Sequence, residues 1–204
     1  MCGVSRSPIA EEKRRLRAEM NTLTRGIDGN QRTAASKSMA SGLITFLADN
    51  RRVALIGLDG PLGTGDLVLS FESYRDEIDT CFLNDALRKA GMRVAYPRVT
   101  GDALEFSNSE TRRHVEIDEA ACVLVPARAF DRSGARLGRG GGHYDRLFAA
   151  HSAPPGAAPP RASPVRIGIA YARQIIDHVP VEPHDMRVTA VATEEGVLVV
   201  DSRR

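Results

Sequence analysis

The sequence predicts a single α/β domain of three layers, in which helices cover both faces of a mainly parallel sheet. Segments with a helical period alternate along the chain with short apolar runs. One of these runs, ACVLVP at residues 121–126, is apolar throughout, which is typical of a strand buried on both faces of a parallel sheet. The chain has 204 residues, of which 42% are hydrophobic, enough for one packed core.

Four segments are predicted as helices because apolar residues recur in them at helical spacing. Ser7 and Pro8 indicate the start of the first helix, since serine caps a helix N-terminus and proline suits its first turn. Gly26 and Gly91 end the first and third helices. The predicted helical ranges are 8–23, 31–47, 76–91 and 144–151.

Short apolar runs bounded by turn residues predict the strands. The run at 51–58 is short for a helix and is expected to be the first strand, and Pro97 is expected to end the third, because proline has no backbone N–H. The predicted strands are 51–58, 67–73, 92–97, 103–107, 121–126, 165–171, 187–193 and 196–200. Residues 151–164 contain five prolines and are expected to form a surface loop.

Composition and charge argue against several classes of function. The formal net charge of +2 is too close to neutral to indicate a nucleic-acid partner. The basic run at 13–17 is by default a solvated helix face. Three widely spaced cysteines indicate neither a disulfide framework nor a zinc site. No apolar run approaches membrane-spanning length, so a cytoplasmic protein without a membrane partner is expected.

The segment DRSGARLGRGGGHYDRLF, residues 131–148, is rich in both glycine and charge. It follows the apolar run 121–126 and leads into a helix, which is where α/β folds bind ligands. Glycines let backbone N–H groups converge on an anion, and Arg136 and Arg139 would add charge-assisted contacts to phosphate. Neither a Walker A loop nor a dinucleotide fingerprint is present, since His143 stands where the third glycine of the fingerprint belongs. A phosphate cradle and a flexible surface connector are both open on these grounds.

Residue identities beyond glycine add a family resemblance. Residues 125–148, VPARAFDRSGARLGRGGGHYDRLF, resemble the signature of the 5-formyltetrahydrofolate cyclo-ligase family. Three further segments are similar to family motifs in order and spacing: KRRLR at 13–17, DEIDT at 76–80 and VPVEPHDMRV at 179–188. The resemblance implies a fold similar to that of sugar-phosphate isomerases and CoA-transferase-like enzymes.

The resemblance also implies a reaction. Members of the family convert 5-formyltetrahydrofolate and ATP into 5,10-methenyltetrahydrofolate, ADP and phosphate, with Mg²⁺ required. The expected partners of this chain are therefore a reduced folate and ATP, bound by a monomer or small homo-oligomer. Transfer of the γ-phosphoryl group to the formyl oxygen makes a good leaving group, and a neighbouring folate nitrogen then closes the ring. Such chemistry needs positioning and charge neutralisation more than a protein nucleophile.

The resemblance assigns roles residue by residue. ATP binding falls to Lys13, Arg17, Arg136, Leu137, Gly138, Arg139, Gly140, Gly141, Gly142, His143 and Tyr144. Folate binding falls to Glu77, Arg139, Gly140, Gly141, Gly142 and His143. The implied Mg²⁺ ligands are Asp145 and Asp185, and the implied catalytic residues are Arg139 and Tyr144.

Several of these residues have a purely structural alternative. Asp145 could cap the helix that follows the loop, and Glu77 could lie in the first turn of its own helix. Asp185 could hold a turn between two strands, and Tyr144 could be a core residue.

The chain also departs from the family pattern at three places. A Gly-Ile-x-Glu-Pro element is missing from residues 109–126, Thr189 stands where a second aspartate is common, and residues 51–66 look like an insertion. These departures leave open a non-catalytic folate- or nucleotide-binding paralogue on the same fold. An enzyme similar to sugar-phosphate isomerases, which needs no nucleotide, is a further alternative.

Overall fold

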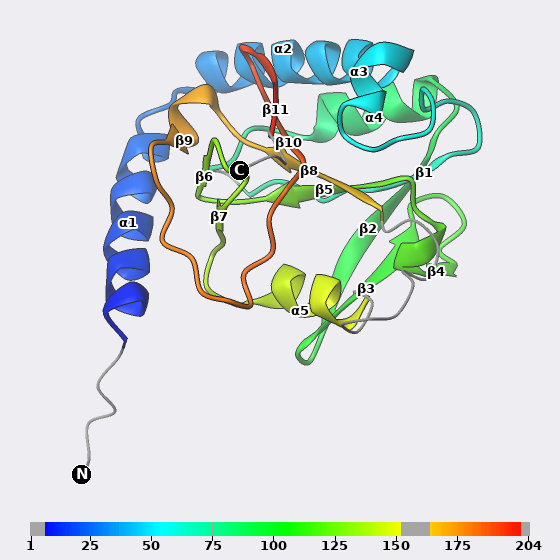
Figure 1. The fold of residues 1–204 in the computed structure, drawn as a ribbon. Helices are drawn as coiled ribbons and strands as arrows, with labels where there is room; N and C mark the ends of the chain where they lie inside the picture. Colours follow the sequence, from blue (N-terminus) through cyan, green and yellow to red (C-terminus); the bar gives the residue numbers. More distant parts are fainter. Residues whose placement is uncertain (1–6, 75, 152–163, 201–204) are drawn as a thin grey trace.

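The computed structural model describes residues 7–74, 76–151 and 164–200, which form two sheets and their covering helices (Figure 1). The α-helices are α1 (Pro8–Arg25), α2 (Gly29–Leu47), α3 (Asn50–Ala54), α4 (Cys81–Lys89) and α5 (His143–Ala150). The large sheet contains β1 (Leu67–Leu69), β2 (Arg93–Thr100), β3 (Ala103–Asn108), β4 (His114–Val115), β5 (Cys122–Pro126), β8 (Val165–Ile169), β10 (Ala190–Thr193) and β11 (Gly196–Val199). The small sheet contains β6 (Ala129–Asp131), β7 (Arg136–Leu137) and β9 (Ile175–Ile176).

The strand order of the large sheet creates a ligand-binding position. The order is β11-β10-β8-β5-β1-β2-β3-β4, and the five strands from β10 to β2 are parallel. Strands β3, β4 and β11 extend this parallel centre as antiparallel edges. From β5 the chain order runs outward to β8 and β10 on one side, and from β1 to β2 on the other. Ligands bind outside the carboxyl ends of strands at such a reversal, here between β1 and β5.

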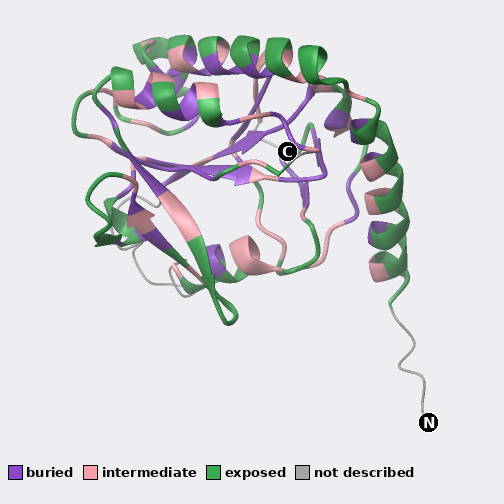
Figure 2. Ribbon diagram, turned by 180° about the vertical axis from the view of Figure 1, so that it is seen from behind, coloured by how far each residue is buried: buried purple, intermediate pink, exposed green. Residues whose placement is uncertain are grey.

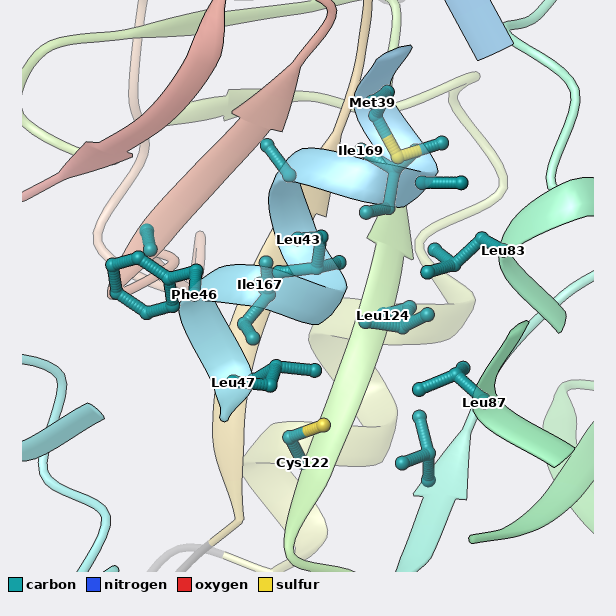
Figure 3. Close-up of a cluster of buried hydrophobic side chains, with 14 of the residues drawn as sticks. Met39, Leu43, Phe46, Leu47, Leu83, Leu87, Cys122, Leu124, Ile167 and Ile169 are labelled. Atoms are coloured by element: carbon teal, nitrogen blue, oxygen red, sulfur yellow. The ribbon is translucent and has the colours of Figure 1, made fainter. Parts of the chain in front are cut away.

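Helices cover both faces of this sheet, so the predicted three-layer α/β fold is confirmed. On one face, Leu43 and Leu47 of α2 pack with Leu83 of α4 over Leu124 and Ile167 of the central strands (Figure 3). These five side chains are 0% exposed, and each contributes roughly 1.5–3 kcal/mol of transfer free energy on burial. Helix α5 packs on the opposite face through its leucine and phenylalanine. No helix in the described residues is long and apolar enough to cross a membrane.

Helix α1 lies apart from the other helices, against the small sheet (Figure 1). The Ser7 side chain accepts a hydrogen bond from the backbone N–H of Ala10, so the predicted N-cap is confirmed. Met20 packs in a separate apolar cluster with Leu137 and Val179. Most of the outer surface of α1 is solvent-exposed (Figure 2). This packing holds the inner face of α1 beside the glycine-rich segment.

The prediction of a strand at 51–58 is wrong. Residues Asn50–Ala54 form helix α3, whose N-terminus is capped by the Asp49 carboxylate. That carboxylate accepts hydrogen bonds from the backbone N–H groups of Arg51 and Arg52 at 2.9 and 3.2 Å. The local cap therefore outweighs the apolar character of the run, which short runs leave ambiguous between helix and strand.

Other element boundaries also differ from the prediction. Strand β1 ends at Leu69, and the helix expected from residue 76 begins at Cys81, so residues 76–80 form a turn. Pro97 does not end its strand, because β1 pairs with β2 only as far as Ala95 and β3 supplies the partner on the other side. The short strands β4, β6, β7 and β9 were not predicted. The surface loop predicted at 151–164 falls outside the described residues, apart from its two ends.

Candidate active site

A cavity of about 660 Å³ opens at the carboxyl ends of β1 and β5. Helix α1 supplies one wall, the segment after β1 a second, the β2–β3 hairpin a third, and the glycine-rich segment the floor between them. Every residue that the sequence assigned to ATP, folate or magnesium lines this cavity. The structure therefore brings together side chains that lie as much as 172 residues apart in the chain.

The glycine-rich segment approaches the cavity with its backbone. Gly140 and Gly142 have φ values of +104° and +66°, which side-chain-bearing residues rarely adopt. Gly142 is also the N-cap of α5, so the positive end of that helix faces the same space. The guanidinium Nε of Arg17 donates a 2.8 Å hydrogen bond to the carbonyl oxygen of Gly138, which fixes the segment against α1. This arrangement is typical of an anion-binding loop and not of a flexible surface connector.

A buried lysine lies on the α1 side of the cavity. The Lys13 ammonium contacts the carboxylates of Glu182 and Asp185 at 2.8 and 2.5 Å, and its side chain is 7% exposed. Burial by itself would lower the pKa of Lys13, but the hydrogen bonds to the two carboxylates outweigh it, so the pKa is raised. Burial by itself would raise the pKa of Asp185, but the hydrogen bonds from Lys13 and from the backbone N–H of Glu182, together with the charge of Lys13, outweigh it, so the pKa is lowered. Lys13 is therefore charged at neutral pH and is not part of a solvated face.

Arg136, also buried, anchors the start of α5. Its Nη2 donates a 2.8 Å hydrogen bond to Oδ1 of Asp145, and its guanidinium lies 5.6 Å from the centroid of the Tyr144 ring. The Tyr144 hydroxyl is buried and has no hydrogen-bond partner among the described residues. Burial raises the pKa of this hydroxyl well above its usual range, so it remains a protonated donor at neutral pH. Its ring is partly buried and packs against the apolar cluster that contains Leu147 and Phe148, so Tyr144 lies at the edge of the core as well as in the cavity.

The opposite end of the cavity is apolar with one paired carboxylate. Phe71, Pro97, Val99 and Leu104 supply the apolar wall. Glu77 is buried, and its Oε1 accepts hydrogen bonds from Nε and Nη2 of Arg139 at 3.0 and 2.8 Å. This end is therefore suited to a flat ring system whose edge carries N–H donors.

The carboxylates of Asp145, Glu182 and Asp185 form the acidic part of the cavity. Oδ1 of Asp145 accepts a 3.3 Å hydrogen bond from the backbone N–H of Met186, which places Asp145 beside the segment that carries Asp185. Glu182, His184 and Asp185 offer possible ligand atoms within 4.8 Å of one another. Carboxylate oxygens are the hard ligands that Mg²⁺ prefers, so the paired carboxylates of Glu182 and Asp185 fit the ion, with Asp145 on the neighbouring segment. Glu182 was not predicted as a site residue, and its proximity to Asp185 in the sequence was the only available signal.

The geometry bears on the structural alternatives for Asp145, Glu77 and Asp185. Asp145 makes no side-chain cap on α5, and Glu77 lies before the first turn of α4, so neither alternative applies. Oδ2 of Asp185 does accept a 2.6 Å hydrogen bond from the backbone N–H of Glu182, so Asp185 holds its turn as well as pairing with Lys13. Thr189 donates its hydroxyl to the carbonyl of Arg166 and does not line the cavity.

Comparison with known proteins shows the family to which this chain belongs. The model of the 5-formyltetrahydrofolate cyclo-ligase family matches residues 9–194, which is most of the chain. The chain belongs to this family. Its fold is similar to the solved structure of a 5,10-methenyltetrahydrofolate synthetase from Mycoplasma pneumoniae, with a TM-score of 0.72, 22% identity, and coverage of 90% of this chain and 99% of the other.

Relatives with the name 5-formyltetrahydrofolate cyclo-ligase differ in how far the similarity extends. The protein from Mycolicibacterium smegmatis is 43% identical over 83 residues, which are 41% of this chain and 38% of that relative. The mouse protein is 24% identical over 92% of this chain and 96% of its own length. An Arabidopsis thaliana relative is 35% identical over 39% of this chain and 29% of its own length. The name of that relative includes the word mitochondrial, so the cytoplasmic location of this chain stays a prediction. The chain thus matches well under two thirds of the length of the Mycolicibacterium smegmatis and Arabidopsis thaliana relatives.

Proposed function

We propose that this cyclo-ligase family member converts 5-formyltetrahydrofolate and ATP into 5,10-methenyltetrahydrofolate, ADP and phosphate, with Mg²⁺ bound. The observation that carries the proposal is the single cavity in which a basic, glycine-rich end adjoins an apolar end with a buried carboxylate. A triphosphate and a flat heterocycle have the charge and shape that these two ends suit. Family membership supports the same pair of substrates.

In this proposal the basic end holds the triphosphate. Backbone N–H groups of the glycine-rich segment and the N-terminus of α5 face the phosphates. Lys13 and Arg17 supply positive charge from α1, and Arg136 supplies it from the floor of the cavity. The Tyr144 hydroxyl, which has no partner among the described residues, donates to the transferred phosphoryl group.

The acidic part of the cavity would hold the metal. Asp145 and Asp185 are the proposed Mg²⁺ ligands, and Glu182 has a carboxylate oxygen within 4.8 Å of a ligand atom of Asp185. Bound Mg²⁺ would neutralise charge on the transferred phosphoryl group. The ion pair of Lys13 with Asp185 keeps that carboxylate ionised and in place, as a ligand must be.

The apolar end would hold the folate. The carboxylate of Glu77 is placed to accept hydrogen bonds from N–H groups on the edge of the pterin ring, while Phe71 and the β2–β3 hairpin exclude water from its faces. The formyl oxygen then lies between the two ends, in reach of the γ-phosphoryl group. Holding both reactants in one orientation supplies much of the expected rate enhancement.

The test is an assay of the purified protein with 5-formyltetrahydrofolate, ATP and Mg²⁺, following the near-ultraviolet absorbance of methenyltetrahydrofolate. The absorbance should rise only when all three are present. Asp145→Asn should abolish most turnover while leaving the protein folded, and Asp118→Asn, on the surface away from the cavity, is the matched control. A folded wild-type protein that binds ATP but forms no product would reject the reaction and favour the non-catalytic paralogue.

A further inference from the structure

A chain of four charged side chains runs from β5 into the cavity. Asp76 lies at its centre: Oδ2 accepts a hydrogen bond from Nη1 of Arg128, and Oδ1 accepts one from Nη2 of Arg139 at 3.2 Å. Arg139 in turn donates to Glu77 through two nitrogens. The contacts of Asp76 link the segment after β1 to the segments after β5 and after β7, across 52 and 63 residues of the chain.

Arg128 is the fixed end of this chain. Its side chain is 9% exposed, and it does not line the cavity. Burial by itself would raise the pKa of Asp76, but the hydrogen bond and charge of Arg128 outweigh it, so the pKa is lowered. Asp76 is therefore ionised at neutral pH, and its orientation is set by a guanidinium that has little freedom to turn.

Arg139 is held on its edge and on one face. Asp76 and Glu77 accept hydrogen bonds along one edge of the guanidinium, and the Tyr74 ring lies 4.2 Å from its central carbon. Without Asp76, Glu77 would be the only carboxylate partner of Arg139 in the described residues. A folate ring that needs the Glu77 carboxylate would then compete with the full charge of Arg139.

We infer that Asp76, anchored by Arg128, is a positioning residue that shares Arg139 with Glu77 and so keeps the Glu77 carboxylate accessible to the folate substrate. The inference deepens the proposed function and rests on it. It places Arg139 with the folate end of the cavity, and it gives Arg128 a role although that residue does not touch the substrate site.

Steady-state kinetics with both substrates test the inference. In Asp76→Asn, KM for 5-formyltetrahydrofolate should rise about tenfold, the size expected when one hydrogen bond to a charged group is lost. KM for ATP should stay within about twofold, because the α1 side of the cavity is unchanged. Asp79→Asn is the matched control, since Asp79 lies in the same turn, is ion-paired with Arg32 and does not line the cavity.

A second variant separates positioning from stability. Asp76→Asn leaves Arg128 buried without a charged partner, whereas the double variant Asp76→Asn/Arg128→Gln removes both charges and should recover most of any loss in Tm. The folate KM of the double variant should stay raised. A folate KM that returns to the wild-type value together with Tm would overturn the inference and leave a purely structural ion pair.

A double-mutant cycle in the substrate-free protein measures the coupling between Asp76 and Arg139 through Tm, without the reaction. The Tm losses of Asp76→Asn and Arg139→Gln should sum to more than the loss in the double variant, because both single changes break the same contact. Additive losses would overturn the inference. If the wild-type protein forms no methenyltetrahydrofolate, the proposed function fails, whereas this cycle still shows whether Asp76 positions Arg139.

Discussion

Replacing Gly140 by alanine separates backbone geometry from side-chain contact in the glycine-rich segment. The residue has φ = +104°, a conformation that strains any L-residue with a side chain. An added Cβ would lie 3.7 Å from Cζ of Arg17, which is ordinary van der Waals contact. Strain in the backbone is therefore the main effect, and it is worth about 1–3 kcal/mol.

The variant is expected to relieve this strain by moving the segment away from its cradle conformation, so ATP binding should weaken. Since 1.4 kcal/mol corresponds to a factor of ten, the strain predicts a loss of about 5- to 150-fold in ATP affinity. Titration calorimetry with ATP and Mg²⁺ measures the affinity, and a thermal melt without ligand shows whether the protein stays folded.

Gly63→Ala is the matched control for Gly140→Ala. Gly63 lies in a turn, has no positive φ and would meet nothing within 4 Å, so its affinity for ATP and its Tm should match the wild type. If Gly140→Ala binds ATP as tightly as Gly63→Ala and melts at the same temperature, the segment does not depend on its backbone conformation and the reasoning is refuted.

Three further variants test other contacts. Lys13→Met leaves the carboxylates of Glu182 and Asp185 without their cation and should lower the free energy of unfolding by about 1–3 kcal/mol in chemical denaturation. Asp185→Asn should make the free energy of unfolding less sensitive to acid. In the wild type the folded protein lowers the pKa of Asp185 below 3.8, so ionised Asp185 stabilises the fold above that pH. This stabilisation is lost as the pH falls through the lower pKa of the folded state. Gly168→Ala should lower stability by about 1–3 kcal/mol, because its Cβ would lie 2.5 Å from the Phe130 ring in a packed core.

Each of these variants has a contrast elsewhere in the chain. Arg14→Met breaks an exposed ion pair on α1 and should cause no measurable loss of stability. Asp85→Asn, at an exposed helical site, should leave the acid limb of the stability curve unchanged. Gly42→Ala, inside α2 with nothing within 4 Å, should increase stability by about 0.5–1 kcal/mol. Equal effects in a variant and its contrast would contradict the corresponding contact.

Local signals predicted the helices and the central strand well where they agreed with the tertiary context. The Ser7 cap and the apolar run at 121–126 depend on neighbours in the chain, so the sequence contains them in full. The run at 51–58 was misassigned because a short apolar segment suits both helix and strand, and the Asp49 cap decided between them. The end of β1 and the path of β2 through Pro97 depend on strand pairing, which no local pattern records.

The candidate site was predictable by motif but its connections were not. The family resemblance named residues from Lys13 to Asp185 that line one cavity. It did not indicate that Lys13 is buried between two carboxylates, or that Glu77 is already paired with Arg139. Such pairs form between segments more than 60 residues apart, and single-sequence periodicity carries no information about them.

The central claim is that phosphoryl transfer from ATP and ring closure of the folate occur in one cavity as one reaction. The most direct measurement is the ratio of ADP to methenyltetrahydrofolate formed by the purified protein in the same reaction mixture. We expect one ADP per methenyltetrahydrofolate, and no ADP when the folate is left out. ADP formed without the folate product, or folate product formed without ADP, would contradict it.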